Sequence, residues 1–346
     1  MNEIAINWQS GIGLLAFAVF TAVLSYFSCL KATNLAIHSG MIAHPGARQS
    51  HAVATPTGGG LGLVFSIVVM AAILHFIFPL PAFWWQKMLP GVLLLVLIGW
   101  RDDKLPVSSF ARLLVQLAVS FWLLGFDWFS LSIEGAVFYV STILAMVWMM
   151  NLYNFMDGSN GMAGFQGVFA GVMVAGLFLI ADQYAMALIS VAVAAACVGF
   201  LPLNFPVATV FMGDVASVPL GFIFAALAVF GLHSGALSWV ATILVMSVFI
   251  VDATLTLLAR VIRGERWYTA HAQHIYQRLI AHGWSHSRVL VVYQSINVML
   301  VMPAVVLAEI YPHYAKVLTG LVFAILGAGW HVANRRLGMF AKEQVT

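Results

Sequence analysis

Long apolar runs dominate the sequence, and they restrict its fold more than any other feature. A helix of about 20 apolar residues spans the hydrocarbon core of a bilayer. Eleven such runs, several of them short, are separated by polar residues, glycine or proline. They lie near 11–30, 58–79, 88–100, 110–126, 136–153, 164–181, 185–203, 218–232, 237–259, 289–311 and 315–334. The pattern predicts an all-α integral membrane protein, a polytopic bundle of about 10–11 transmembrane helices.

Composition excludes a water-soluble globule. Of the 346 residues, 62% are hydrophobic and 8% are charged, whereas soluble proteins have about 45–50% apolar and 25% charged residues. The remaining loops are too short for a separate soluble enzyme, so residues 1–346 are expected to form one integral membrane catalytic domain with cytoplasmic active-site loops. Cys29 and Cys197 both lie in apolar runs, which argues against a disulfide framework. The absence of Lys or Arg before the first run argues against a cleavable signal.

The basic residues are distributed unevenly between alternate loops. Of the 15 Lys and Arg residues, all but Lys87 and Lys316 fall in one set of loops. The positive-inside rule places that set in the cytoplasm. The sequence therefore predicts an outside N-terminus, an inside C-terminus and two long cytoplasmic polar stretches, 31–57 and 260–288.

Acidic residues gather at the expected cytoplasmic ends of the spans. Six of the twelve lie there: Asp102, Asp103, Asp157, Asp214, Asp252 and Glu265. Acids at a membrane boundary are costly and suggest function. The adjacent carboxylates of Asp102 and Asp103 repel each other, which a divalent cation or a base with a raised pKa would relieve. The alternative is that both are solvated loop acids paired with Arg101 and Lys104.

A polar residue recurs at every third position from 151 to 160. Asn151, Asn154, Asp157 and Asn160 are expected to share one helix face as it leaves the bilayer. Such a face suits a ligand rich in hydroxyl and phosphoryl oxygens, although polar contacts between helices are the alternative. Further along, Asp214 precedes a span, where it can bind a metal ion, cap the helix or do both.

Two other segments predict phosphate binding. His271 and His274 lie in a basic loop, and His and Arg side chains suit phosphate better than zinc because no Cys or HExxH helix accompanies them. The glycines at 58–60, which follow Arg48 and open the second span, offer backbone amides to a phosphate. Close helix packing explains those glycines nearly as well.

Together these segments resemble the polyprenyl-phosphate N-acetylhexosamine-1-phosphate transferases. This family includes the phospho-MurNAc-pentapeptide transferase of peptidoglycan synthesis and the initiators of O-antigen and enterobacterial common antigen. The motifs that carry the resemblance are RQSH…PTGGG (48–60), Asp102-Asp103 with Arg112 and Gln116, NFMDGSNGMAG (154–164), FMGD (211–214), Asp252 and the His loop.

The resemblance implies a reaction at the cytoplasmic face of the bacterial inner membrane. Undecaprenyl phosphate would attack the β-phosphorus of a UDP-N-acetylhexosamine and release UMP, with Mg²⁺ required and Mn²⁺ as a substitute. No nucleic-acid partner is implied, and a homodimer is left open. The rival from another class is a secondary transporter, which is disfavoured because the acids gather at one face and no internal repeat is visible.

The resemblance also implies roles for individual residues. Asp214 and Asp157 would be the metal-associated acids, and Asp102 and Asp103 would supply the base, the nucleophile or further metal contacts. The substrate-binding candidates are Arg48, Arg112, Asn154, Asn160, Asn204, His271 and His274.

Two departures from the family pattern bear on the sugar. Position 160 is Asn where many members have Asp, and the loop reads HAQH instead of a triple-His run. Both favour the subgroup that starts O-antigen or a similar glycan from UDP-GlcNAc, UDP-FucNAc or UDP-QuiNAc. The alternative within the family is the peptidoglycan enzyme.

Overall fold

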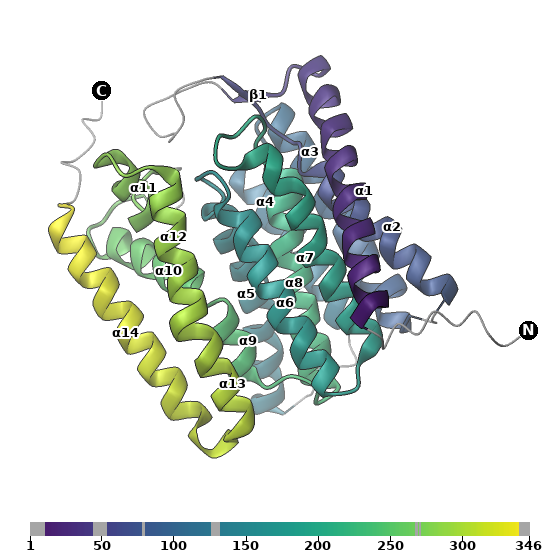
Figure 1. The fold of residues 1–346 in the computed structure, drawn as a ribbon. Helices are drawn as coiled ribbons and strands as arrows, with labels where there is room; N and C mark the ends of the chain where they lie inside the picture. Colours follow the sequence, from purple (N-terminus) through teal and green to yellow (C-terminus); the bar gives the residue numbers. More distant parts are fainter. Residues whose placement is uncertain are drawn as a thin grey trace, which may run out of the picture.

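The computed structural model describes residues 11–43, 54–77, 80–125, 132–266, 269 and 271–338. This part of the chain is almost entirely helical (Figure 1). The helices are α1 (Gly11–His38), α2 (Leu61–Ile77), α3 (Leu89–Lys104), α4 (Ser109–Leu124), α5 (Ile133–Phe155), α6 (Met162–Ile180), α7 (Tyr184–Asn204), α8 (Asp214–His233), α9 (Trp239–Val245), α10 (Ser247–Ile262), α11 (Ile275–Ala281), α12 (His286–Ile296), α13 (Met302–Ile310) and α14 (Ala315–Arg336). Two π-helical segments, η1 (Phe83–Met88) and η2 (Asn297–Val301), and the 3-10 turn η3 (Pro312–Tyr314) join neighbouring helices. Two short antiparallel strands, β1 (Ile42–Ala43) and β2 (Thr55–Pro56), are the exception to the expected all-α fold.

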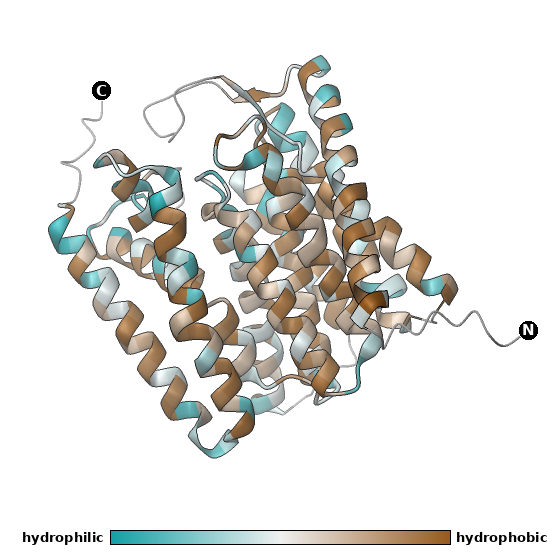
Figure 2. Cartoon of the chain, viewed as in Figure 1, coloured by the Kyte–Doolittle hydropathy of each residue, from teal (hydrophilic) through white to brown (hydrophobic). Residues whose placement is uncertain are grey.

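The helices confirm a polytopic membrane protein. Among the described residues, eight helical segments are long and apolar enough to cross a membrane, and the bent pair α9–α10 makes up to nine. Each of the eleven expected runs coincides with helical structure, but α2 and α4 are only 17 and 16 residues long. Figure 2 shows hydrophobic residues along the lengths of the helices and hydrophilic residues gathered at many of their ends.

Two expected spans differ in detail. The run 88–100 is part of a longer span, because η1 continues directly into α3 to give the 22-residue segment Phe83–Lys104. The run 237–259 is not one straight helix, because α9 and α10 meet at an angle of 72°.

One end of the bundle, uppermost in Figure 1, gathers the polar segments. Here α3, α5, α7, α10 and α14 end, and α2, α4, α6, α8 and α12 begin. Helices α7 and α8 are buried along most of their length, whereas α14 is largely exposed. The start of α8 therefore lies at the centre of the polar end, where the acidic residues meet.

Candidate active site

The start of α8 is capped by an acid from another helix. Asp103, in the last turn of α3, accepts hydrogen bonds from the backbone N–H of Asp214 (3.0 Å) and of Val215 (3.1 Å). A carboxylate at this position pairs two N–H groups that a helix start leaves open and opposes the positive end of the helix dipole. The alternative that Asp214 caps α8 is therefore wrong.

Gly213 permits this close approach of α3 to α8. Its φ of +78° lies in the region that favours glycine, and a Cβ atom would overlap the Asp103 carboxylate. The same Cβ would lie 2.9 Å from the backbone nitrogen of Gly58. The FMGD turn therefore requires glycine both for its conformation and for its packing.

Arg112 links two of the predicted acids. Its Nη1 lies 2.8 Å from Asp102 Oδ2 and 3.0 Å from Asp214 Oδ2. The other oxygen of Asp102 accepts a hydrogen bond from the backbone N–H of Val107 at 2.6 Å, which closes the α3–α4 turn. Arg101 donates instead to the carbonyl of Leu105, so Asp102 is not a loop acid paired with its sequence neighbour.

Asp157 completes a cluster of four acids, which we call the carboxylate cluster: Asp102, Asp103, Asp157 and Asp214. Asp157 follows the end of α5 and accepts a hydrogen bond from the backbone of Gly213, while Asn154 bonds to the side chain of Asp214. Burial, followed by the negative charges of Asp214 and Asp103, raises the pKa of Asp157 well above its ordinary value. Arg112 contacts two of the four acids, so the cluster holds more acidic than basic groups, and a bound cation would favour the ionised form of Asp157.

The expected helix face over residues 151–160 does not form as predicted, because α5 ends at Phe155. Asn151 donates to Gln116 at 2.7 Å, which is a contact between helices. Asn160 lies in the following turn, where its side chain donates to the carbonyl of Pro206 at 3.1 Å. Of the four residues expected on this face, only Asn154 and Asp157 bond to the Gly213-Asp214 turn in the part of the chain that the structure describes.

Asn204 holds loops together. The side chain is 4% exposed, accepts from the N–H of Gly161 at 2.7 Å and donates to the carbonyl of Val210 at 2.9 Å. Both ends of the amide are bonded to the backbone, so Asn204 positions these loops, and its expected contact with substrate stays a prediction.

The glycine motif pairs with the FMGD turn. The N–H of Gly59 donates to the carbonyl of Phe211, and that of Gly60 donates to Met212, both at 3.1 Å. In return, the N–H of Phe211 donates to the carbonyl of Pro56 at 2.8 Å. These two amides therefore bond to the FMGD turn, which agrees with the alternative that the glycines serve close packing. Arg48 lies outside the described residues, and its role stays a prediction.

Asp252 anchors the His loop. One carboxylate oxygen accepts from the backbone N–H of Ile275 at 2.9 Å, and the other accepts from the hydroxyl of Tyr293 at 2.6 Å. These bonds tie the start of α11 to α10 and α12. Asp252 is one of the residues that carry the family resemblance, and in the structure it anchors the His loop to α10 and α12.

The two predicted histidines lie together, but their exposure differs. Their ring centroids are 4.9 Å apart, and His274 stacks between Phe155 and Tyr276 with 2% of its surface exposed, whereas His271 is half-buried. Burial lowers the pKa of His274 to about 4, and burial with His274 and Arg260 lowers that of His271 to about 3. Both rings are therefore neutral at pH 7. His271 can offer an N–H to a phosphate, whereas the buried ring of His274 supports the ring of His271.

Two arginines of the loop serve the fold. Arg263 is held by Glu265 at 2.6 Å and by Gln273 at 2.8 Å. Arg278, 3% exposed, donates to Asn334 and to the carbonyl of Gly338 at the end of α14. The expectation that the loop arginines bind phosphate is therefore replaced, for these two, by a role in loop structure.

The buried histidine makes the fold sensitive to acid. Because the pKa of His274 falls from 6.5 to about 4 on folding, its contribution to stability is present above pH 6.5 and is lost as the pH falls towards 4. We expect the thermal midpoint of the detergent-solubilised protein to drop over this range, and His274→Gln to flatten the drop. His313→Gln, at an exposed histidine of η3, is the control. A His274→Gln midpoint that falls as steeply as that of the wild type would contradict this reading.

Sequence reasoning missed Tyr276. Its hydroxyl donates to the carbonyl of Phe155 at 2.8 Å and so joins the His loop to the end of α5. His286, on α12, makes a second junction, because its Nδ1 lies 2.9 Å from the hydroxyl of Ser159. No spacing or charge pattern marks Tyr276. His286 belongs to the basic His loop, but its contact with Ser159 could not be predicted, because both residues act across more than 100 residues of sequence.

The resemblance implies a magnesium ion at the carboxylate cluster. Among the described residues, no group of three or more His, Cys, Asp or Glu side chains is arranged so that it could hold a metal ion. Mg²⁺ does not need one, since it is usually held by one or two carboxylates together with water and substrate phosphates. Asp157 and Asp214, which lie close enough for their charges to interact, are the candidates for such a partly built site.

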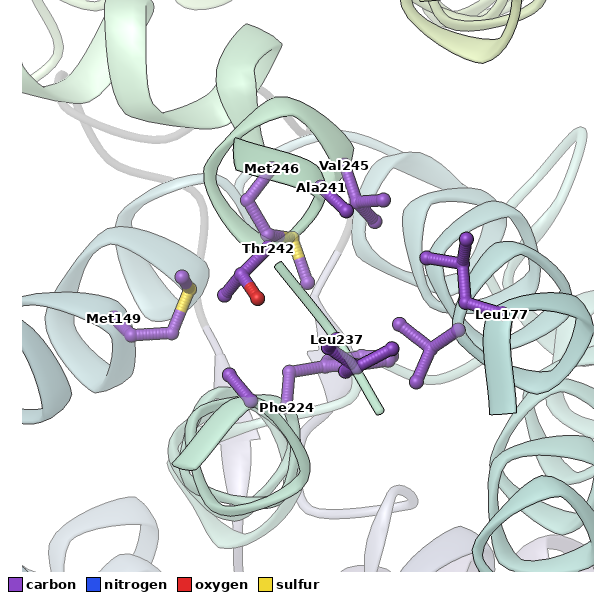
Figure 3. A pocket seen from close by; sticks show the side chains of 10 residues that line it. Met149, Leu177, Phe224, Leu237, Ala241, Thr242, Val245 and Met246 are labelled. Carbon is purple, nitrogen blue, oxygen red and sulfur yellow. The ribbon is translucent and has the colours of Figure 1, made fainter. Parts of the chain in front are cut away.

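An apolar pocket lies deeper in the bundle (Figure 3). Its lining comes from α5, α6, α8, the turn before α9 and the α9–α10 junction: Met149, Val174, Leu177, Phe224, Ala228, Leu237, Ala241, Thr242, Val245 and Met246. Phe224 follows Asp214 by ten residues on α8, which places it about 15 Å further along the helix axis. The cavity has a volume of about 20 Å³, room for about one water molecule, so it is a small void in the bundle and not a groove for a lipid chain.

Comparison with known proteins identifies the family. Residues 85–232 match the model described as "Glycosyl transferase family 4". The decaprenyl-phosphate N-acetylglucosaminephosphotransferase of Mycolicibacterium smegmatis is 31% identical over 326 residues, which cover 80% of this chain and 78% of that protein. The probable undecaprenyl-phosphate N-acetylglucosaminyl 1-phosphate transferase of Bacillus subtilis is 28% identical over 79% of each chain. The phospho-N-acetylmuramoyl-pentapeptide-transferase of Halalkalibacterium halodurans is 32% identical over 73% of this chain and 83% of its own. The chain therefore belongs to glycosyl transferase family 4, the polyprenyl-phosphate N-acetylhexosamine-1-phosphate transferases related to the phospho-MurNAc-pentapeptide transferase.

Proposed function

We propose that the protein transfers N-acetylhexosamine-1-phosphate from a UDP-sugar to undecaprenyl phosphate and releases UMP. The observation that carries this proposal is the carboxylate cluster, bridged by Arg112, at the polar end of a membrane bundle. The similarity to polyprenyl-phosphate transferases of Bacillus subtilis and Mycolicibacterium smegmatis supports it. Membership of this family sets the transporter alternative aside.

The chemistry is a direct displacement at phosphorus. A phosphate oxygen of the lipid forms a bond to the β-phosphorus of the UDP-sugar, and the bond from that phosphorus to the bridging oxygen breaks with its electron pair leaving on UMP. A phosphate monoester is largely dianionic at pH 7, so the attacking oxygen needs no general base. Both oxygens of Asp102 and of Asp103 accept hydrogen bonds from other groups, which argues against either acid as a covalent nucleophile.

The remaining residues position and neutralise charge, which is most of what phosphoryl transfer requires of a protein. Asp157 and Asp214 would hold Mg²⁺, or Mn²⁺ in its place. The ion, when bound, would offset the charge of the diphosphate. Asn154 orients Asp214, Arg112 balances Asp102 and Asp214, and His271 offers a neutral N–H to phosphate.

The donor is the finer part of the proposal. We expect UMP release with UDP-GlcNAc, UDP-FucNAc or UDP-QuiNAc, as for an enzyme that starts O-antigen or a similar glycan, and none with UDP-MurNAc-pentapeptide. A peptide needs further polar contacts, but Asn160 and Arg263 are already bonded within the protein. A parallel assay of these donors with purified protein, undecaprenyl phosphate and Mg²⁺ decides between them. Preference for the pentapeptide donor would overturn the choice of sugar and leave the reaction type intact.

The proposal also places the site in the cytoplasm, at the inner membrane of a bacterium. The uneven distribution of Lys and Arg supports this orientation. We expect single cysteines in 260–288 to react with a membrane-impermeant reagent only from inside, and those in the 182–185 turn only from outside. Native Cys29 and Cys197 are buried, which keeps the background low. Labelling of both segments from the same side would contradict the orientation.

A further inference from the structure

The hydroxyl group of Tyr276 uses its full hydrogen-bonding capacity inside the protein. It donates to the backbone carbonyl of Phe155 at 2.8 Å, and it accepts from the backbone N–H of Gly158 and from the side-chain amide of Gln277. A hydroxyl has one proton to donate and two lone pairs that accept, so three partners saturate it. Tyr276 is fully buried, and water therefore does not compete for these bonds.

Two of the three partners lie on either side of Asp157. Phe155 is the last residue of α5, so its carbonyl is one of those that a helix end leaves open. Gly158 follows Asp157 directly. The hydroxyl thus holds the backbone before and after Asp157, while the carboxylate itself is bonded to the backbone of Gly213. One side chain of α11 therefore fixes the turn that carries an acid of the carboxylate cluster.

Gly158 lets the hydroxyl come this close to the turn. A Cβ atom at position 158 would overlap the hydroxyl oxygen of Tyr276 and would lie 3.2 Å from the ring carbon that carries it. The ring has little room to move, because it is fully buried and stacks on His274 with the two planes 10° apart. The φ of Gly158 is not positive, so packing and not backbone conformation requires glycine here.

Gln277 extends the connection to the start of α11. Its side-chain oxygen accepts from the backbone N–H of His274 at 3.2 Å, and its amide bonds to the Tyr276 hydroxyl. The ring of His274 lies 4.9 Å from that of His271, measured between centroids. Hydrogen bonds therefore run without a break from the turn of Asp157 to the residue that supports His271.

We propose that Tyr276 is a positioning residue that couples the His loop to the carboxylate cluster by holding Asp157 in place relative to His271. This inference rests on the proposed function, in which both residues serve the diphosphate of the donor. The His loop has a separate anchor in Asp252. Loss of the hydroxyl should therefore release the turn of Asp157 and leave the loop in place, so that the reaction step suffers more than donor binding.

Kinetics separate this role from a general loss of structure. We expect Tyr276→Phe to lower the kcat for UMP release about tenfold, the effect of a lost buried hydrogen bond, and to leave the KM for the UDP-sugar within about twofold. Tyr293→Phe removes a hydroxyl from Asp252, the other anchor of the loop, and should instead raise that KM. A wild-type kcat in Tyr276→Phe, or a KM raised as in Tyr293→Phe, overturns the inference.

Tyr139→Phe is the matched control. Tyr139 is also buried, and its hydroxyl donates to a backbone carbonyl, that of Gly125, at 2.9 Å. It lies near the opposite end of α5 from Phe155. The same substitution there should keep the kcat and both KM values of the wild type.

A double-mutant cycle tests the match between positions 158 and 276. Gly158→Ala alone should lower kcat at least as much as Tyr276→Phe, because the new methyl group drives the hydroxyl away from the turn. The double variant should be no worse than Gly158→Ala, since phenylalanine lacks the atom that the methyl group overlaps. Fully additive effects overturn the contact as the means of positioning.

Amide exchange measures the same link without turnover. Tyr276→Phe should speed hydrogen–deuterium exchange in peptides that cover 155–160 about tenfold and leave exchange in peptides that cover α11 within about twofold. Unchanged exchange over 155–160, or equal acceleration in both segments, overturns the inference. If the wild-type protein releases no UMP with any donor, the proposed function fails, whereas the exchange rates still decide whether the hydroxyl holds the turn.

Discussion

Replacing Asp214 by asparagine should lower the rate of UMP release more than about 100-fold, because loss even of residues that only support metal ligands costs 10–100-fold. The amide keeps the shape of the side chain but cannot balance a divalent charge or the guanidinium of Arg112, which lies 3.0 Å away. The α8 cap should survive, since Asp103 supplies it. The measurements are UMP release at increasing Mg²⁺ and the thermal midpoint.

Asp182→Asn is the matched control for this change. Asp182 is an exposed acid in the turn before α7, where its carboxylate accepts a hydrogen bond from Tyr184, and its φ of 56° suits asparagine equally well. This variant should keep wild-type activity. Near-normal activity in Asp214→Asn would show that the metal ion and the diphosphate are held elsewhere.

Gly213→Ala should abolish activity and lower stability together. The added methyl group overlaps the Asp103 carboxylate and comes within 2.9 Å of the backbone of Gly58. Backbone at this position cannot yield as a flexible side chain can, so α3 and the 55–60 segment must move away from the FMGD turn. The expected result is a loss of activity of more than about 100-fold, since a displacement near 1 Å costs a catalytic site that much, with a lower thermal midpoint.

Gly235→Ala isolates the contribution of backbone conformation. Gly235 has a similar φ of +72°, but a Cβ atom there meets nothing within 4 Å. Its replacement should cost about 1–2 kcal/mol of stability through the left-handed conformation alone and leave UMP release unchanged. Equal effects of the two substitutions on activity would show that the packing at Gly213 is not what the site requires.

The sequence predicted the helices well because hydropathy is a local property. Each apolar run carries its own signal, and each coincides with helical structure. The α9–α10 bend of 72° could not be predicted in this way, because residues 239–262 contain neither glycine nor proline and read as one apolar run.

The acids that lie together at the start of α8 could be singled out for a similar reason, but their contacts could not. A carboxylate at a membrane boundary is conspicuous wherever it stands. Whether Asp103 caps a helix or contacts substrate depends on a partner 111 residues away. The same distance in sequence concealed Tyr276 and its bond to Phe155. His271 and His274 were found as a pair, whereas the difference in their exposure follows from the packing of aromatic rings around them.

The two parts of the site occupy successive stretches of the chain, and this order has a consequence for biosynthesis. The carboxylate cluster, Arg112 and the paired segments at 55–60 and 211–214 all precede the end of α8 at His233. The His loop and its anchor Asp252 follow that point. At about 5–20 residues per second, the roughly 55 residues from His233 to the end of the His loop at 288 take on the order of 3–11 s to translate. A nascent chain can therefore assemble its acidic centre in the membrane well before the ribosome has delivered the loop that completes it.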